Sequence, residues 1–250
     1  MKALILAAGL GTRLGSLTRH TPKPMLPVGG RPLLEHILEL LRSHGVTEIT
    51  LNLHHQPDTI LNHFGSGEAW GVRLRYSYEA ELLGSAGTAL RHLAWFYPDP
   101  CLVYYGDVYS DANLSELMQR HLFSGAAATI AVYQAPDPAR GGIVQFDKNG
   151  RVRSFVETPP ADSVLSHWAN AGIYVLNPEV LHFVTGIPSD FEYDVFPRLL
   201  DAGQMIHAYP LTGTLIDIGT PENYQVVQQL FSAQTTSSQS ARLGMTPAPA

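Results

Sequence analysis

The chain alternates short runs that are apolar, or that alternate apolar and polar residues as 72–78 does, with longer segments in which apolar residues recur every three or four positions. The short runs predict strands, and the periodic segments predict amphipathic helices. The strands predicted in the first half are 3–8, 48–53, 72–78, 101–105 and 127–132. The helices predicted between them are 32–43, 57–64, 85–96 and 114–123. This alternation is typical of a doubly wound, mostly parallel sheet with helices on both faces.

The pattern changes in the second half of the chain. Apolar and polar residues alternate on both sides of Asn149-Gly150, and an Asn-Gly pair in that setting is a strong signal for a β-hairpin. The elements predicted here are the hairpin strands 143–146 and 152–156, strands 171–176 and 215–218, and helices 193–200 and 221–231. The predicted fold class is therefore α/β, with a mixed, mostly parallel sheet and a small antiparallel lobe.

The end of the chain differs in composition from the rest. From Ser232 to Ala250 it runs SAQTTSSQSARLGMTPAPA, which is polar, small and proline-containing. Such a segment has too little apolar surface to form a packed core. We predict one domain over 1–231 and a disordered tail over 232–250.

Composition narrows the functional classes. The 250 residues carry a net charge of -6, which argues against a nucleic-acid partner. No apolar run approaches the ~18 residues of a membrane span, and the N-terminus lacks the features of a signal peptide. The single cysteine, Cys101, lies in an apolar run and excludes an internal disulfide. These features predict a cytoplasmic protein without a membrane partner, and they leave a homo-oligomer open.

A glycine-rich, basic segment follows the first predicted strand. Residues 8–14, AGLGTRL, lie beyond the carboxyl end of that strand, where ligands of open α/β sheets bind. Glycines leave backbone N–H groups accessible to an anion, and the planar guanidinium of Arg13 suits phosphate. Lys23 lies between Pro22 and Pro24, which stiffen its backbone. The segment therefore predicts a site for a phosphate group.

Two common phosphate-binding motifs do not fit this segment. The dinucleotide fingerprint G-x-G-x-x-G would need a glycine at position 14, which is Leu14. The P-loop sequence G-x-x-x-x-G-K-[ST] does not occur in the chain. The predicted phosphate site belongs to neither class.

The stretch LAAGLGTRL followed by PKPMLPV resembles the sugar-1-phosphate nucleotidyltransferases, the pyrophosphorylases that make nucleotide sugars. The resemblance continues in family order through LGSAGT, YGD, FVE, NAGIY and IDIGTP, and it spans residues 1 to about 230. It looks closest to the mannose-1-phosphate guanylyltransferase branch. It implies a Rossmann-like fold, the partners nucleoside triphosphate and sugar 1-phosphate, and Mg²⁺ as cofactor.

The resemblance also implies roles for individual residues. Arg13 would stabilise the departing pyrophosphate, and Lys23 would neutralise the approach of the two phosphates. Asp107 would be the third catalytic residue and would hold Mg²⁺ together with Asp217; Mg²⁺ prefers one or two carboxylates plus phosphate oxygens and water. The residues implied to bind the nucleotide are Leu6, Ala7, Ala8, Gly9, Gly11, Thr12, Arg13, Glu79, Gly84 and Gly87. The residues implied to bind the sugar are Gly142, Glu157 and Asn170.

The base and the acceptor stay open. Glu79 and Glu81 precede Gly84, where the family binds its base, and a carboxylate can accept both N–H groups of guanine, whereas uracil offers one. This favours GTP, with uridylyl, thymidylyl or cytidylyl transfer as alternatives. The family commonly has Glu-Lys-Pro where this chain has Thr158 in the middle position, and Arg140 is a candidate replacement for that lysine. Transfer to phosphocholine and a non-catalytic nucleotide-sugar regulator remain alternatives.

Overall fold

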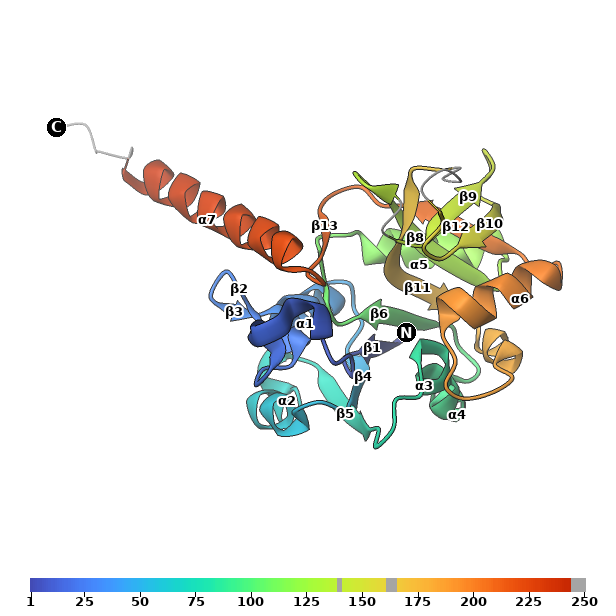
Figure 1. The fold of residues 1–250 in the computed structure, drawn as a ribbon, viewed down its shortest axis with the longest axis horizontal. Helices are drawn as coiled ribbons and strands as arrows, with labels where there is room; N and C mark the ends of the chain where they lie inside the picture. The colour runs from blue at the N-terminus through green and yellow to red at the C-terminus, as the bar shows by residue number, and fades with distance from the viewer. Residues whose placement is uncertain (139–140, 161–165, 244–250) are drawn as a thin grey trace.

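The computed structural model describes residues 1–138, 141–160 and 166–243 (Figure 1). Its centre is a nine-stranded mixed sheet in the order β10-β9-β11-β6-β1-β4-β5, with β8 paired to β11 and β12. The strands of this sheet are β1 (Lys2–Leu6), β4 (Glu48–Leu53), β5 (Arg73–Tyr78), β6 (Cys101–Tyr105), β8 (Ala128–Gln134), β9 (Ile143–Phe146), β10 (Val152–Val156), β11 (Trp168–Leu176) and β12 (Ile206–Pro210).

The four parallel strands β6, β1, β4 and β5 form one half of the sheet. β1 is covered on both sides, because Ala3 and Ile5 belong to one buried cluster and Leu4 to the other. A strand buried on both faces is expected to be uniformly apolar, as the run at 3–8 is. β11 runs antiparallel to β6 and joins the second half of the chain to the same sheet.

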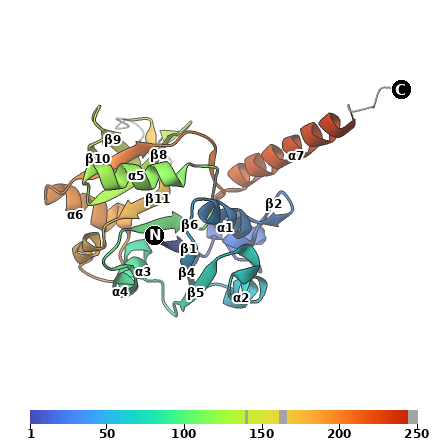
Figure 2. The same cartoon turned by 180° about the vertical axis from the view of Figure 1, so that it is seen from behind.

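Helices cover both faces of the sheet. They are α1 (Leu33–Ser43), α2 (Pro57–Phe64), α3 (Ser85–Arg91), α4 (Leu93–Phe96), α5 (Leu114–Ser124), α6 (Phe196–Asp201) and α7 (Pro221–Leu243). Side chains of α1, α2 and α5 pack into one core cluster, and those of α3, α4 and α6 into the other. Figure 2, seen from behind, shows α5 in front of the sheet.

Two small antiparallel sheets lie outside the main one. β2 (Pro27–Val28) pairs with β3 (Arg31–Pro32), and β7 (Val108–Ser110) pairs with β13 (Leu215–Asp217). The short helical turns are η1 (Thr12–Thr18), η2 (Lys23–Met25), η3 (Glu68–Trp70), η6 (Pro178–Phe183) and the π-helical turn η7 (Phe191–Val195). The strands of the second pair hold residues of the predicted metal site at their ends.

The predicted fold class is confirmed. Strands 48–53 and 101–105, helix 57–64 and both strands of the Asn-Gly hairpin occur with the predicted bounds. The predicted helix 85–96 is divided at His92, whose backbone (φ -105°, ψ 9°) leaves the helical conformation. Strands β7 and β12 were not predicted. β7 has only three residues, and β12 ends in a proline, so neither shows a clear strand pattern in the sequence.

Helix α7 continues into the segment predicted as a tail. Between Pro221 at its first position and Leu243 at its end the sequence has no glycine and no further proline, so it contains no strong helix breaker. Residues 232–243 form the last part of α7, and residues 244–250 lie outside the described part. The division into one domain over 1–231 and a disordered tail over 232–250 stays a prediction. Figure 1 shows α7 leaving the body of the molecule.

Two further features, the single cysteine and possible membrane spans, were considered from composition. Cys101 is fully buried in β6, and burial raises the pKa of its thiol to about 12, which makes it a packing residue. In the described residues, no helix is both long enough and apolar enough to span a bilayer.

Candidate active site

A cavity of about 1160 Å³ opens where β1, β4 and β6 end. The carboxyl ends of parallel strands form this edge of the sheet, as expected for an α/β ligand site. Other lining residues come from the second half of the chain, through β8, β11, η7 and the loops beside β9 and β10. The predicted residues that line the cavity are Leu6, Ala7, Ala8, Gly9, Arg13, Lys23, Glu79, Gly84, Asp107, Gly142, Glu157, Thr158, Asn170 and Asp217.

Four residues considered for the site are absent from the described lining: Gly11, Thr12, Glu81 and Gly87. The Gly11 carbonyl accepts hydrogen bonds from the Leu14 N–H and the Thr18 hydroxyl, so Gly11 shapes the loop. The Gly87 N–H donates to the Ser189 carbonyl at 3.0 Å, so this amide is already engaged by protein. Arg140, the candidate replacement for the family lysine, lies outside the described residues.

Lys23, Asp107 and Asp217 meet at one end of the cavity. In the β7–β13 pair, Asp217 lies opposite Val108, and the Ile218 N–H donates to the Asp107 carbonyl at 2.9 Å, so the two aspartates are neighbours. Lys23 is 7% exposed; its Nζ donates to Asp107 Oδ2 and lies 3.6 Å from Asp217 Oδ1. One ammonium thus serves two carboxylates.

The charge of this cluster is not fully balanced. Desolvation and the neighbouring Asp107 carboxylate raise the pKa of Asp217, although Lys23 and Arg13 act in the opposite direction. An additional cation would relieve this repulsion. Among the described residues no group of three or more His, Cys, Asp or Glu side chains could enclose a metal ion. The pair therefore fits Mg²⁺ that also takes oxygens from phosphate and water.

Arg13 reaches the same corner of the cavity. A side chain on Gly219 would place its Cβ 2.9 Å from Arg13 Nη2 and 2.9 Å from Asp217 Oδ1. The lack of a side chain at Gly219 therefore lets the guanidinium approach the aspartate pair. Arg13 is exposed and lines the cavity, so its guanidinium is accessible to a ligand. Two cationic side chains and two carboxylates thus surround one small region.

Glu79 lies deep in the wall next to the first strand. It is 1% exposed, and its Oε1 accepts hydrogen bonds from Asn52 Nδ2 at 3.0 Å and Thr88 Oγ1 at 2.6 Å. Its Oε2 accepts from the Leu83 N–H at 3.2 Å. Asn52 also accepts from the Ala7 N–H at 2.7 Å, so it ties the end of β1 to Glu79. Asn52 was missed because a single amide within an apolar strand gives no distinctive sequence signal.

The three predicted sugar-binding residues lie together. A side chain on Gly142 would place its Cβ 2.2 Å from Glu157 Oε2, so only glycine lets the carboxylate occupy this position. The Gly142 carbonyl accepts from the Asn170 N–H at 2.7 Å. Carboxylate and amide groups therefore converge on one wall of the cavity, and this arrangement can bind adjacent hydroxyl groups.

Glu192 is the main cavity residue that the sequence did not predict. It lies in η7 and accepts hydrogen bonds from the hydroxyls of Tyr105 and of Tyr174, the latter at 2.8 Å. Burial raises the pKa of Glu192. Desolvation and the nearby Glu192 raise the pKa of Glu157 to about 7. No local pattern marked Glu192, because of its two neighbours Phe191 is buried and Tyr193 is exposed.

Thr158 has an unusual backbone conformation. Its φ is +50°, which is uncommon for a β-branched residue, and it lines the cavity directly after Glu157. Such outliers are concentrated at functional sites. The position that differs from the family pattern is therefore also a locally strained one.

Fold and site together define a class of α/β protein in which one cavity, at the carboxyl ends of parallel strands, is lined by basic side chains, carboxylates and an amide. The sequence model of the family described as Nucleotidyl transferase matches residues 2–234. The chain belongs to this family, as the resemblance predicted.

Individual relatives extend the comparison. The chain is 39% identical over 236 residues to a "Probable mannose-1-phosphate guanylyltransferase 1" of Oryza sativa subsp. japonica, covering 92% of this chain and 64% of the relative. It is 36% identical over 252 residues to a "UTP--glucose-1-phosphate uridylyltransferase" of Synechocystis sp., covering 94% of this chain and 64% of the relative. The chain thus spans about 64% of the length of these relatives.

Solved structures resemble the fold. A putative glucose-1-phosphate thymidylyltransferase from Bacillus anthracis superposes with a TM-score of 0.84 at 24% identity, covering 92% of this chain and 95% of that one. At this identity the likeness concerns the arrangement of helices and strands.

Proposed function

We propose that this protein transfers a nucleotidyl group from a nucleoside triphosphate, with GTP preferred, to a sugar 1-phosphate and releases pyrophosphate. The observation that carries the proposal is the lining of the large cavity. It combines Arg13, Lys23 and two aspartates with the hydroxyl-pairing groups Glu157 and Asn170. A cavity with both kinds of group suits a molecule pair that joins phosphates to a polyhydroxylated ring.

In the proposed reaction, an oxygen of the sugar phosphate attacks the α-phosphorus, and the bond to the departing pyrophosphate breaks. Both reactants are anions, so the protein must position them and balance their charge. Lys23 neutralises the approaching phosphates, and Arg13 stabilises the charge on pyrophosphate. Asp107 and Asp217 would hold Mg²⁺, which neutralises phosphate oxygens when bound. No side chain needs to act as a nucleophile.

The sugar end supports hydroxyl recognition through a shared proton. Because Glu157 has a pKa of about 7, it is partly protonated near neutral pH and can both donate and accept. The Asn170 Nδ2 donates to the Tyr174 hydroxyl at 2.7 Å, which fixes the amide orientation. These groups pair with neutral hydroxyls better than with a quaternary ammonium, so a sugar is favoured over choline.

The choice of base rests on the relatives. The hydrogen bonds of Glu79 leave one acceptor site on its Oε2, and one acceptor serves guanine and uracil equally. Glu79 therefore does not discriminate by itself as the sequence suggested. Several relatives are described as mannose-1-phosphate guanylyltransferases, whereas one is described as a uridylyltransferase. This majority supports GTP.

A substrate panel tests the proposed function. Purified protein would be incubated with Mg²⁺, each of GTP, UTP, dTTP and CTP, and each of several hexose 1-phosphates, while released pyrophosphate is measured. We expect the fastest release with GTP and mannose 1-phosphate. Fastest release with another triphosphate would overturn the base assignment. Tight binding without release in any combination would instead support the non-catalytic regulator.

Glu157→Gln is expected to change how stability depends on pH. The pKa of Glu157 is raised from 4.5 to about 7 in the folded protein, so the folded state binds the extra proton across that window. Stability is therefore lost as pH rises from 4.5 to 7, and glutamine removes this loss. Because Glu157 is only partly buried, we expect the variant to gain roughly 1–2 kcal/mol relative to the parent between pH 5 and pH 8.

Urea unfolding at both pH values measures this gain. The matched control is Glu179→Gln, which changes an exposed carboxylate at the first turn of η6. Equal pH slopes for Glu157→Gln and the parent would contradict the raised pKa.

A further inference from the structure

Helix α7 is attached to both sides of the charged cluster. Its first turn contacts the strand that ends at Asp217: the Asn223 Nδ2 donates to the Asp217 carbonyl at 2.8 Å. The backbone continues from Asp217 through Gly219 and Thr220 directly into the helix. The orientation of α7 is therefore coupled to the position of this aspartate.

The next turns of α7 contact the β2–β3 hairpin, which follows Lys23. The Pro27 carbonyl accepts two hydrogen bonds from α7, one from the Tyr224 hydroxyl at 2.7 Å and one from Gln228 Nε2. Phe231 covers the turn of the hairpin: a Cβ on Gly29 would lie 2.3 Å from the Phe231 ring, and the φ of +57° at Gly29 also favours glycine. Three residues of one helix thus hold the hairpin.

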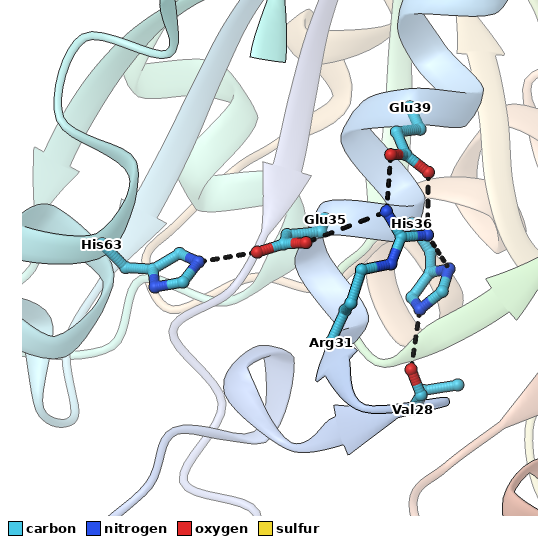
Figure 3. Close-up of polar contacts among 6 residues, drawn as sticks. All are labelled: Val28, Arg31, Glu35, His36, Glu39 and His63. Carbon is cyan, nitrogen blue, oxygen red and sulfur yellow. Dashed lines mark hydrogen bonds and ion pairs between the residues drawn. The ribbon is translucent and has the colours of Figure 1, made fainter. Parts of the chain in front are cut away.

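Helix α1 holds the same hairpin from another side, as Figure 3 shows. His36 Nε2 lies 2.8 Å from the Val28 carbonyl, so this nitrogen carries the proton and donates it. The other ring nitrogen accepts from Arg31 Nη2 at 3.3 Å, and Arg31 in turn makes two hydrogen bonds to Glu39. The His36 ring also meets the Phe231 ring edge-on at 5.0 Å, which joins the two helices.

The hairpin is connected to Lys23 by a short, hydrogen-bonded stretch of backbone, so fixing the hairpin also restricts Lys23. Two backbone hydrogen bonds close the turn η2. The Met25 N–H donates to the Pro22 carbonyl, and the Leu26 N–H donates to the Lys23 carbonyl. Leu26 is 3% exposed, and its carbonyl accepts from the Leu33 N–H at 3.0 Å. Few soft torsions therefore lie between Pro27 and the ammonium-bearing residue.

We propose that a hairpin clamp, formed by His36, Tyr224, Gln228 and Phe231, sets the position of Lys23 against Asp107 and Asp217 and thereby the rate of transfer. This inference rests on the proposed function. The clamp residues do not line the described cavity, so they are positioning residues that act through Lys23. Helix α7 thereby fixes the separation between the segment that carries Asp217 and the segment that carries Lys23.

The double variant Tyr224→Phe/Gln228→Met tests the clamp. It removes both donors to Pro27 but keeps the ring and the chain length, and Pro27 is exposed, so water can replace the lost bonds. We expect kcat to fall about tenfold, as for a small misplacement of a charged group, with KM for both substrates within about twofold. The control is Tyr76→Phe/Gln229→Met, which removes a tyrosine–carbonyl bond of 2.8 Å elsewhere and changes an exposed glutamine of α7.

A double-mutant cycle with Lys23→Ala separates positioning from general stability. If the clamp acts through Lys23, the clamp substitutions lower kcat in the parent and have no further effect in the Lys23→Ala background. The inference would be overturned if the clamp substitutions lowered kcat equally in both backgrounds, or if they did not lower kcat in the parent. A parent-like rate for Lys23→Ala alone would instead reject the role of Lys23 in the proposed function, and the clamp with it.

Hydrogen exchange tests the hold on the hairpin without any assay of turnover. The backbone N–H groups of the non-proline residues between positions 22 and 32 are expected to exchange at least several-fold faster in Tyr224→Phe/Gln228→Met than in the parent, with no change in the control. Unchanged exchange in this segment would also overturn the inference, even where the proposed transfer activity is intact.

Discussion

Asp107→Asn is expected to lower kcat about a thousandfold or more while leaving the fold intact. The substitution removes the carboxylate that pairs with Lys23 and that would bind the divalent ion with Asp217. Asparagine has nearly the same shape, and the backbone contact through which Asp107 accepts from Ile218 remains. Pyrophosphate release under saturating substrates measures the loss, and circular dichroism and thermal unfolding check the fold.

A second carboxylate serves as the control for Asp107. Asp201 is exposed at the end of α6, away from the cavity lining, so Asp201→Asn is expected to keep the rate of the parent. Near-normal turnover by Asp107→Asn would exclude both its metal role and its pairing role.

Lys23→Ala is the other change with a large expected effect. In the proposed mechanism this ammonium neutralises phosphates as they approach, so its loss raises the barrier by about 2–4 kcal/mol, which lowers kcat roughly 30- to 900-fold. KM should change much less, because the interaction strengthens as charge develops in the transition state. Steady-state kinetics with each substrate varied in turn measures both quantities.

Removal of Lys23 also has an electrostatic consequence for the free protein. Asp107 and Asp217 lose their shared cation, so their repulsion is no longer offset and the variant should be less stable than the parent at neutral pH. Lys148→Ala changes an exposed lysine in the turn of the β9–β10 hairpin and is the matched control. In the kinetic experiment, a weaker affinity of Lys23→Ala for its substrates together with an unchanged kcat would contradict the role assigned to Lys23.

The fold was largely predictable because its signals are local. The apolar runs that became β1 and β6 are buried on both faces, so they lack polar interruptions. The Asn149-Gly150 turn likewise fixes its own hairpin. The place of the cavity was predictable from the glycine-rich loop and Arg13 after the first strand, since strand ends in such sheets are where ligands bind.

The remaining parts of the site depend on contacts between distant segments. The pairing of β7 with β13 brings Asp217 beside Asp107, although they are 110 positions apart (217 − 107). A strand at 215–218 was predicted, but its three-residue partner β7 is too short to show a period. Glu192 is buried by tyrosines from β6 and β11 that lie far away in sequence. The hold of α7 on Pro27 has no sequence signature either, because its acceptor is a backbone carbonyl.

The most direct test of the central claim is ³¹P NMR of the reaction mixture. Parent protein, GTP, mannose 1-phosphate and Mg²⁺ should yield a sugar–nucleoside diphosphate and pyrophosphate in equal amounts, and Asp107→Asn under the same conditions should yield neither at a comparable rate. Absence of a joined product with the parent in every combination of triphosphate and hexose 1-phosphate would contradict the account, as would undiminished formation by Asp107→Asn.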